Sequence, residues 1–279
     1  MSESETNRIK RIRDFIDVNA TPTFCLAKWQ HVTMYLQTGE THSCYHPQPH
    51  KVPLAELKDN PSALHNTMHK KLERKEMLEG KKPEGCQYCW NIEAMGKDYI
   101  SDRHIRNGSI FTEERYEQTA KGPWDQNINP EYLEINFGNE CNFKCGYCCP
   151  SFSSLWEDEI KQHGNYDIQY NQYGIESKIY SEKEYNPYVE AFWKWWPNLK
   201  NDLKIFRITG GEPLMTANTF KLLDMLKKDG NPELFLQINT NLGVTNRKVV
   251  DFCSRVQELI EMKHVKNIRV FTSIECTGK

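Results

Sequence analysis

Three cysteines in one short segment constrain this chain more than any other feature of its sequence. Cys141, Cys145 and Cys148 have the spacing C-x3-C-x2-C and follow residues 132–137, whose alternation of apolar and polar residues predicts a β-strand. Thiolates this close together are a soft ligand set suited to an iron–sulfur cluster. Because a [4Fe–4S] cube normally takes four thiolates, three of them leave one iron open to a ligand that is not protein. We therefore predict a cluster with an open coordination position.

Zinc is the alternative metal, but structural zinc prefers closed four-ligand sites, usually built from paired C-x2-C knuckles. The spacing, and the aromatic Tyr147 before the last cysteine, favour the cluster. Residues 140–148 resemble the signature of the radical S-adenosylmethionine (radical SAM) superfamily. The resemblance implies a catalytic [4Fe–4S] cluster whose open iron binds S-adenosylmethionine, with Tyr147 among the cofactor-binding residues. Reductive cleavage then gives a 5′-deoxyadenosyl radical that abstracts hydrogen from substrate, and a reductase or a ferredoxin- or flavodoxin-type protein donates the electron.

A second motif, Gly210-Gly211-Glu212-Pro213, follows a predicted strand at 203–209. A Gly-Gly turn alone fits any tight connection from a strand to a helix, since glycine tolerates unusual backbone angles. In this position it resembles the GGEP motif of the radical SAM superfamily. The resemblance implies that the backbone carbonyls and Glu212 receive the ammonium group of S-adenosylmethionine.

Predicted strands at 132–137, 203–209, 234–239 and 268–275 alternate with predicted helices at 152–164, 188–199, 216–228 and 246–261. This order favours an α/β fold with a parallel sheet and functional residues at the carboxyl ends of the strands, where Asn241, Ser273 and Glu275 fall. By resemblance, Ser273 and Glu275 hydrogen-bond ribose or methionine groups. The radical SAM barrel has six βα units and only four strands are found here. We therefore expect a partial (βα)6 TIM-like barrel, truncated at its C-terminal end.

The N-terminal part of the chain carries four further cysteines. Residues 31–36 and 41–45 predict a hairpin, with Cys25 before its first strand and Cys44 at the end of its second, so folding could bring the two sulfurs together. A helix expected from Pro61 to Gly80, capped by Asn60, precedes the knuckle Cys86-x2-Cys89. Taken alone, the four thiolates Cys25, Cys44, Cys86 and Cys89 fit zinc and a cluster equally well.

The spacing of Cys25, Gly39 and Cys44 resembles the opening of the SPASM and twitch auxiliary-cluster domains, and most of all the shorter twitch form. The resemblance implies a second, auxiliary [4Fe–4S] cluster, although these domains usually follow the catalytic barrel and this one precedes it. Zinc, or no metal, is the alternative. His42, His46 and His50 lie nearby in sequence and could replace a thiolate, but exposed hairpin histidines are the commoner case.

Composition and charge narrow the remaining classes. A net charge of -2 gives no electrostatic case for nucleic-acid binding. The sequence contains neither a secretion signal nor an apolar run long enough to span a membrane. Ten cysteines without an export signal indicate metal ligands rather than disulfides, and hence a cytoplasmic protein. We expect that Cys149 is not a ligand and that Cys253 and Cys276 are buried free thiols.

These observations predict two domains, a twitch/SPASM-like auxiliary domain over 1–125 and an incomplete radical SAM core over 126–279, with 91–129 as a polar connector. The predicted function is that of a radical SAM enzyme of unknown substrate. The resemblance to twitch and SPASM domains suggests modification of a peptide or protein, or a related small-molecule oxidation. One alternative is an iron–sulfur electron-transfer or scaffold protein without catalysis. Another is a zinc-binding interaction module.

Overall fold

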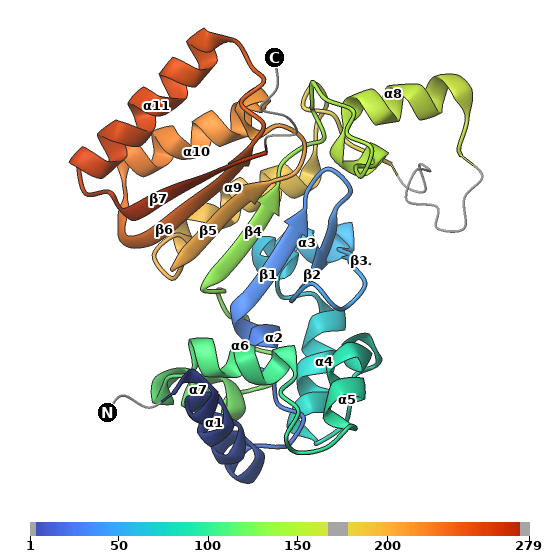
Figure 1. The fold of residues 1–279 in the computed structure, drawn as a ribbon, viewed down its shortest axis with the longest axis vertical. Coiled ribbons are helices and arrows are strands. Elements are labelled where there is room, and N and C mark those ends of the chain that lie inside the picture. The colour runs from blue at the N-terminus through green and yellow to red at the C-terminus, as the bar shows by residue number, and fades with distance from the viewer. Residues whose placement is uncertain (1–3, 167–177, 274–279) are drawn as a thin grey trace. The chain divides into compact units, whose positions relative to one another are not determined.

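The structure is a computed structural model that describes residues 4–166 and 178–273 (Figure 1). The chain divides into two compact units, the first formed by Met1–Thr33 and Thr41–Glu131 and the second by Met34–Glu40 and Tyr132–Lys279. The strands follow the order β3-β2-β1-β4-β5-β6-β7. Residues 34–40, in the predicted hairpin, belong to the second unit, where the Leu36 N–H donates to the Asn136 carbonyl at 2.9 Å. The predicted domain boundary at residue 125 would instead place residues 34–40 in the N-terminal domain.

The first unit is mostly helical, with short strands. Its elements are α1 (Glu5–Asn19), α2 (Ala27–Gln30), β1 (His31–Tyr35), β2 (Glu40–His42), β3 (His50–Lys51), α3 (Leu54–Asp59), η1 (Pro61–Leu64), α4 (Met68–Leu78), η2 (Glu84–Cys86), α5 (Gln87–Glu93), α6 (Asp102–Ile110) and α7 (Glu113–Ala120). Helix α1 begins after Ser4, whose side chain accepts a hydrogen bond from the Asn7 N–H. It packs against α6 at Gly108, where any Cβ would meet Ile9 at 2.8 Å.

Two expectations for this unit are wrong. The helix predicted from Pro61 to Gly80 is interrupted: Asn60 caps only η1, and Thr67 caps a separate α4 by accepting from the Lys70 N–H. The segment 91–129, predicted as a connector with short helical patterns, does contain the short helices α6 and α7, but it belongs to the first compact unit. Helix α6 carries a reciprocal cap between Ser101 and His104, which uses His104 in place of the usual Glu or Gln and is easily missed in a sequence.

The second unit alternates strands and helices as predicted. Its elements are β4 (Tyr132–Asn136), η3 (Pro150–Phe152), α8 (Ser154–His163), α9 (Pro187–Leu199), β5 (Ile205–Thr209), η5 (Pro213–Met215), α10 (Ala217–Lys228), β6 (Asn231–Thr240), α11 (Asn246–Glu261) and β7 (Val265–Thr272). Strands β4 to β7 pair in parallel, each with the next. The unit is therefore an α/β sheet in which the carboxyl ends of four strands meet at one edge.

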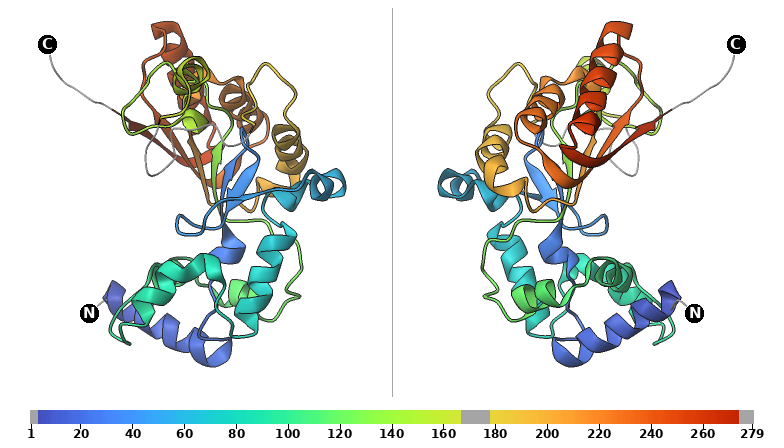
Figure 2. Two further views of the ribbon diagram at one scale, coloured as in Figure 1. Left: turned by 90° about the vertical axis from the view of Figure 1, so that its right-hand side faces the viewer. Right: turned by 90° about the vertical axis from the view of Figure 1, so that its left-hand side faces the viewer.

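One face of this parallel sheet is apolar and covered by helices. Leu133, Phe206 and Leu236 are aligned across the sheet and fully buried. Phe206 contacts Phe192 and Trp196 of α9, so the aromatic stripe of that helix belongs to the core, as its sequence suggests. Helices α10 and α11, orange to red, lie side by side against the sheet (Figures 1 and 2).

Among the residues that the structure describes, the longest helix is α11, with 16 residues. Spanning a bilayer takes about 20 consecutive apolar residues in a helix. None of the described helices is long and apolar enough to cross a membrane.

Candidate metal centres

The three-cysteine loop lies at the carboxyl end of β4 and is held through its backbone. The Cys148 N–H donates to the Cys145 carbonyl at 3.0 Å, which turns the loop back on itself. Ser154, at the start of α8, accepts from the Cys141 N–H and donates to its carbonyl, both at 3.2 Å. The Trp156 indole donates to the Cys145 carbonyl at 2.9 Å. Because these contacts use no sulfur, the three thiols stay available as ligands.

The three thiols of this loop are free and differ in burial. Cys141 is buried, whereas Cys145 and Cys148 are half-buried. Burial raises the pKa of the Cys141 thiol, and it raises that of Cys148 to about 11. Without a metal these two thiols stay protonated near neutral pH, so binding a soft metal must release their protons. Tyr147 is 70% exposed at the tip of the loop.

The glycine turn after β5 passes directly beside this loop. Gly210 has φ +77°, and a Cβ there would overlap the Asn136 carboxamide at 1.8 Å. A Cβ on Gly211 would meet the Glu140 carbonyl oxygen at 2.6 Å. The Glu212 N–H donates to that same carbonyl at 2.7 Å. Two glycines are therefore required for the turn to approach the segment that leads into Cys141.

Glu212 joins the ends of two strands. Its side chain is almost completely buried and accepts from the Leu214 N–H at 2.9 Å, the Thr240 hydroxyl at 2.5 Å and the Asn241 N–H at 2.7 Å. A carboxylate offers about four lone-pair sites, so these bonds occupy most of its capacity. Pro213 follows it, buried, as the first residue of η5.

Two asparagines link the turn after β6 to the cysteine loop. The Asn142 amide donates to the Gly243 carbonyl at 2.6 Å, and the Asn241 amide donates to the Asn142 oxygen at 3.1 Å. The Ser273 N–H donates to the Thr240 carbonyl at 3.0 Å, at the same edge of the sheet. The structure thus gathers Gly210, Gly211, Glu212, Asn241 and Ser273 at the strand ends near the cysteines. Glu275 lies outside the described residues.

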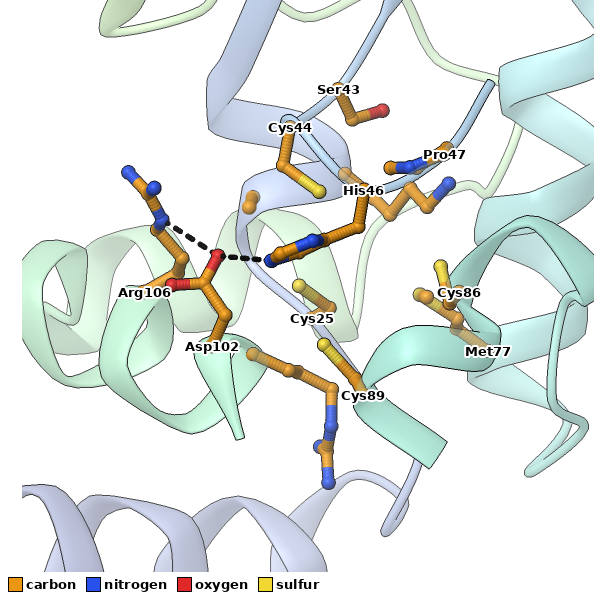
Figure 3. A pocket seen from close by; sticks show the side chains of 13 residues that line it. Cys25, Ser43, Cys44, His46, Pro47, Met77, Cys86, Cys89, Asp102 and Arg106 are labelled. Carbon is orange, nitrogen blue, oxygen red and sulfur yellow. Dashed lines mark hydrogen bonds and ion pairs between the residues drawn. The ribbon is translucent and has the colours of Figure 1, made fainter. Parts of the chain in front are cut away.

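The other four predicted ligands line one cavity in the first unit. Cys25 precedes α2, Cys44 follows β2, Cys86 ends η2 and Cys89 lies in α5, and all four are free thiols. They border a common cavity of about 20 Å³. The sulfurs of Cys25, Cys44 and Cys89 point into it from three different segments (Figure 3). Tertiary folding therefore brings together ligands that are up to 64 positions apart in the sequence.

This cavity has an electropositive wall. Burial raises the pKa of all four thiols, that of Cys86 to about 11, while the Lys28 ammonium counteracts the rise at Cys44 and Cys86. Lys28 itself is buried and paired with Glu73 at 2.6 Å. A neighbouring ammonium favours the thiolate form, which is the form that binds metals.

Three side chains beside the cysteines were not predicted from the sequence. Lys28, Asp102 and Arg106 all line the cavity, and Figure 3 shows the last two. Asp102 is 3.3 Å from His46 and 3.2 Å from Arg106, and the His46 ring stacks on Tyr88. The charged residues of α6 lie in a segment whose polar sequence predicts a connector, so the sequence does not indicate that they lie beside the cysteines. The sequence signal that could have predicted α6 is Ser101, a capping residue that precedes an amphipathic stretch.

The histidines considered as substitute ligands have other partners. The His42 Nδ1 contacts the Cys44 carbonyl, and the His50 Nε2 is 2.8 Å from the Thr67 hydroxyl. His46 is paired with Asp102. The cavity therefore offers four sulfurs as its natural donor set.

Within residues 4–166 and 178–273, no three histidine, cysteine or acidic side chains lie as close together as a single metal ion requires. One Zn²⁺ draws four sulfurs to within roughly 4 Å of one another, because each Zn–S bond is about 2.3 Å. An iron–sulfur cube occupies the space between its cysteines and holds them farther apart. Because every proposed donor in the first unit is a thiol, its donor chemistry fits zinc and an iron–sulfur cluster alike.

Comparisons with known proteins agree with the sequence motifs. The family model described as the radical SAM superfamily matches residues 135–275, half of the chain. The GTP 3′,8-cyclase of Campylobacter lari is 24% identical over 121 residues, which are 43% of this chain and 30% of that protein. The GTP 3′,8-cyclase of Staphylococcus epidermidis is 30% identical over 108 residues, 38% of this chain and 26% of the relative. The matches thus span less than a third of these relatives, and no solved structure matches the chain significantly.

Proposed function

Because the chain belongs to the radical SAM superfamily, we propose that its second unit cleaves S-adenosylmethionine reductively on a [4Fe–4S] cluster held by Cys141, Cys145 and Cys148. The observation that carries this proposal is the junction of three elements at the strand ends. The cysteine loop, the glycine turn and the turn after β6 are joined there by Glu212 and by the amides of Asn142 and Asn241. Three free thiols beside a close-approach glycine turn fit a cluster that keeps one iron for an outside ligand.

When bound, the cluster supplies the electron that splits S-adenosylmethionine into methionine and a 5′-deoxyadenosyl radical, which abstracts hydrogen from the substrate. The chain binds and orients these groups. Gly210 and Gly211 offer backbone carbonyls to the ammonium group of S-adenosylmethionine. Glu212 keeps that turn in register with β6 and has one lone-pair site left for the same ammonium. Asn241 and Ser273 stand at the strand ends as further polar contacts.

For the first unit we propose a second, auxiliary [4Fe–4S] cluster on Cys25, Cys44, Cys86 and Cys89. The shared cavity and its lysine support a tetrathiolate site, and the resemblance of the Cys25, Gly39 and Cys44 spacing to the twitch form favours a cluster over zinc. A site with four protein ligands has no open iron. Such a cluster would serve as an electron carrier, and the twitch-like character of the unit is part of this proposal.

The substrate remains a prediction. The twitch- and SPASM-like spacing suggests a peptide or protein, whereas the names of the relatives supply GTP as a competing choice. A ferredoxin, flavodoxin or dedicated reductase is the expected electron donor.

The testing experiment measures iron, sulfide and 5′-deoxyadenosine after anaerobic reconstitution of the full chain. Wild type should hold about eight irons, and Cys141/Cys145/Cys148→Ala about four, with no 5′-deoxyadenosine formed by the mutant. Cys253→Ala is the matched control, because Cys253, which was predicted to be buried, is an exposed free thiol in α11 and should change neither number.

Three results would contradict parts of this proposal. Wild-type turnover in the triple mutant would remove the catalytic assignment. About four irons in wild type, falling to none in the mutant, would exclude an iron–sulfur cluster from the first unit. Wild-type iron without any cleavage of S-adenosylmethionine would favour a non-catalytic electron-transfer protein.

A further inference from the structure

Beside the four-cysteine cavity, the first unit buries an unusual group of positive charges. Lys28, Lys70 and Arg74, here called the cation cluster, are each at most 2% exposed. Among the residues that the structure describes, Glu73 is the one carboxylate within ion-pair distance of the cluster, at 2.6 Å from Lys28. These three buried side chains thus share one carboxylate, that of the partly exposed Glu73.

The other partners of the cation cluster are neutral. The Lys70 ammonium lies 2.7 Å from His65 Nδ1, and Arg74 donates to the Asn66 side chain and the Lys28 carbonyl, both at 3.0 Å. His65 cannot offset any charge. Burial and the two neighbouring cations Lys70 and Arg74 keep its pKa well below the usual range, so the imidazole is neutral.

Buried charges without a counter-charge are costly, because water no longer solvates them and the low dielectric amplifies their repulsion. Dipoles of a carbonyl, an amide and an imidazole soften this cost but carry no net charge. Lys28 of the cation cluster lines the four-cysteine cavity together with all four thiols, so a metal-bound tetrathiolate would place negative charge beside it. Neutral thiols or two disulfides would supply none.

We propose that the negative charge of a metal-bound tetrathiolate is the missing counter-charge of the cation cluster, so that the first unit reaches its full stability only when metal is bound. Four thiolates around a [4Fe–4S]²⁺ core, or around Zn²⁺, carry a net charge of about −2. Lys70 needs this charge most, because burial and the neighbouring Arg74 and Lys28 hold the pKa of its ammonium group well below the usual range. The inference rests on the proposed metal site in the first unit and adds that the site and its buried lysines form one electrostatic unit.

Two substitutions with opposite expected effects on metal affinity test the inference. Lys70→Met removes a buried cation at similar length and shape, so metal affinity should fall about tenfold. Glu73→Gln removes the competing anion and should raise metal affinity by a similar factor. The measurements are chelator competition on protein loaded with ferrous iron and sulfide, and the urea midpoint of loaded and metal-stripped protein. The gap between these midpoints should shrink in Lys70→Met and widen in Glu73→Gln.

Lys75→Met, on the exposed side of α4, removes one positive charge from the same helix and is the matched control. It should leave both affinity and midpoints unchanged. If Lys70→Met and Glu73→Gln both weaken metal binding, or neither changes it, the cation cluster is a packing feature and the inference is wrong. A wild-type first unit without metal would instead overturn the proposed site. Should stripped Lys70→Met fail to fold, the affinity change in Glu73→Gln still decides the outcome.

Discussion

The two groups of cysteines in this chain differ in how far apart they lie in the sequence and in what holds them in place. In the second unit, three ligands come from eight consecutive residues, two of them half-buried, and hydrogen bonds hold the loop through its backbone. In the first unit, four ligands come from separate segments, and three of them are buried. Charged side chains surround that cavity. One centre is open and held by backbone contacts, and the other is closed and held by tertiary packing.

The open arrangement suits reaction with an outside ligand, and the closed arrangement suits a centre that holds charge. An open centre needs a coordination position for an outside ligand, and a short loop provides it because three thiolates leave one iron exposed. A closed centre needs all of its ligands from protein and a matched charge, which requires several packed elements. The comparison predicts that the two centres respond independently to mutation and unequally to acid.

The largest expected effect is selective loss of metal. Cys145→Ala should abolish iron binding at the open centre and leave the closed centre loaded, whereas Cys89→Ala should do the reverse. Each change removes a ligand from one unit only. Iron and sulfide analysis on the two variants checks this, with Cys149→Ala, a thiol beside the open centre, as the control. Loss of both centres in either variant would show that the two are coupled.

The next effect concerns the junction around Glu212. Glu212→Ala leaves three donors, Leu214 N–H, Thr240 hydroxyl and Asn241 N–H, without their acceptor. We expect the free energy of opening this region to fall by about 3 kcal/mol. Hydrogen exchange of peptides from the second unit measures it, and peptides from the first unit should keep their protection. The exposed Glu233→Ala, on β6, serves as the control.

Acid should weaken the first unit through histidines buried in neutral form. Burial lowers the pKa of His31 to about 3, with Arg106 adding to the effect, and burial beside His69 lowers that of His50 to about 3. Unfolded histidine titrates near 6.5, so the unfolded chain binds more protons between pH 6.5 and 3. Stability is therefore present above pH 6.5 and is lost as pH falls, by at most about 1.4 kcal/mol per pH unit for each histidine.

Calorimetry from pH 7 to pH 5 checks this sign. In His31→Gln the drop in Tm over that range should be smaller than in wild type, because one buried titrating group is gone. His163→Gln, at the exposed end of α8, is the control and should behave as wild type. An unchanged acid dependence in His31→Gln would remove this histidine from the explanation.

The smallest effect is expected at Asn142, whose side chain ties the cysteine loop to the turn after β6. Asn142→Ala removes two hydrogen bonds and should cost about 1–2 kcal/mol of loop stability. Iron should then leave the open centre faster under a chelator, while its release from the closed centre stays unchanged. Equal release rates in mutant and wild type would show that the loop holds its shape without this contact.

Local patterns in the sequence determined much of the second unit. The spacing of Cys141, Cys145 and Cys148 lies within one loop, and the strands and helices around it follow from alternation and helical periodicity. The order of alternating elements was sufficient to predict the parallel pairing of β4 to β7. The role of Glu212 in joining two strand ends was not visible, because its partners Thr240 and Asn241 are 28 and 29 positions away.

For the first unit, the sequence alone identified the four cysteines as a set but not their surroundings. The Lys28–Glu73 pair, the His46–Asp102 contact and the burial of Lys70 depend on helices packed from distant segments. A lysine in a sequence is ordinarily assigned to the surface, since burying its charge is costly without a partner. Only the tertiary structure reveals such partners, because the local periodicity of a sequence does not indicate which distant charged residues become neighbours in the fold.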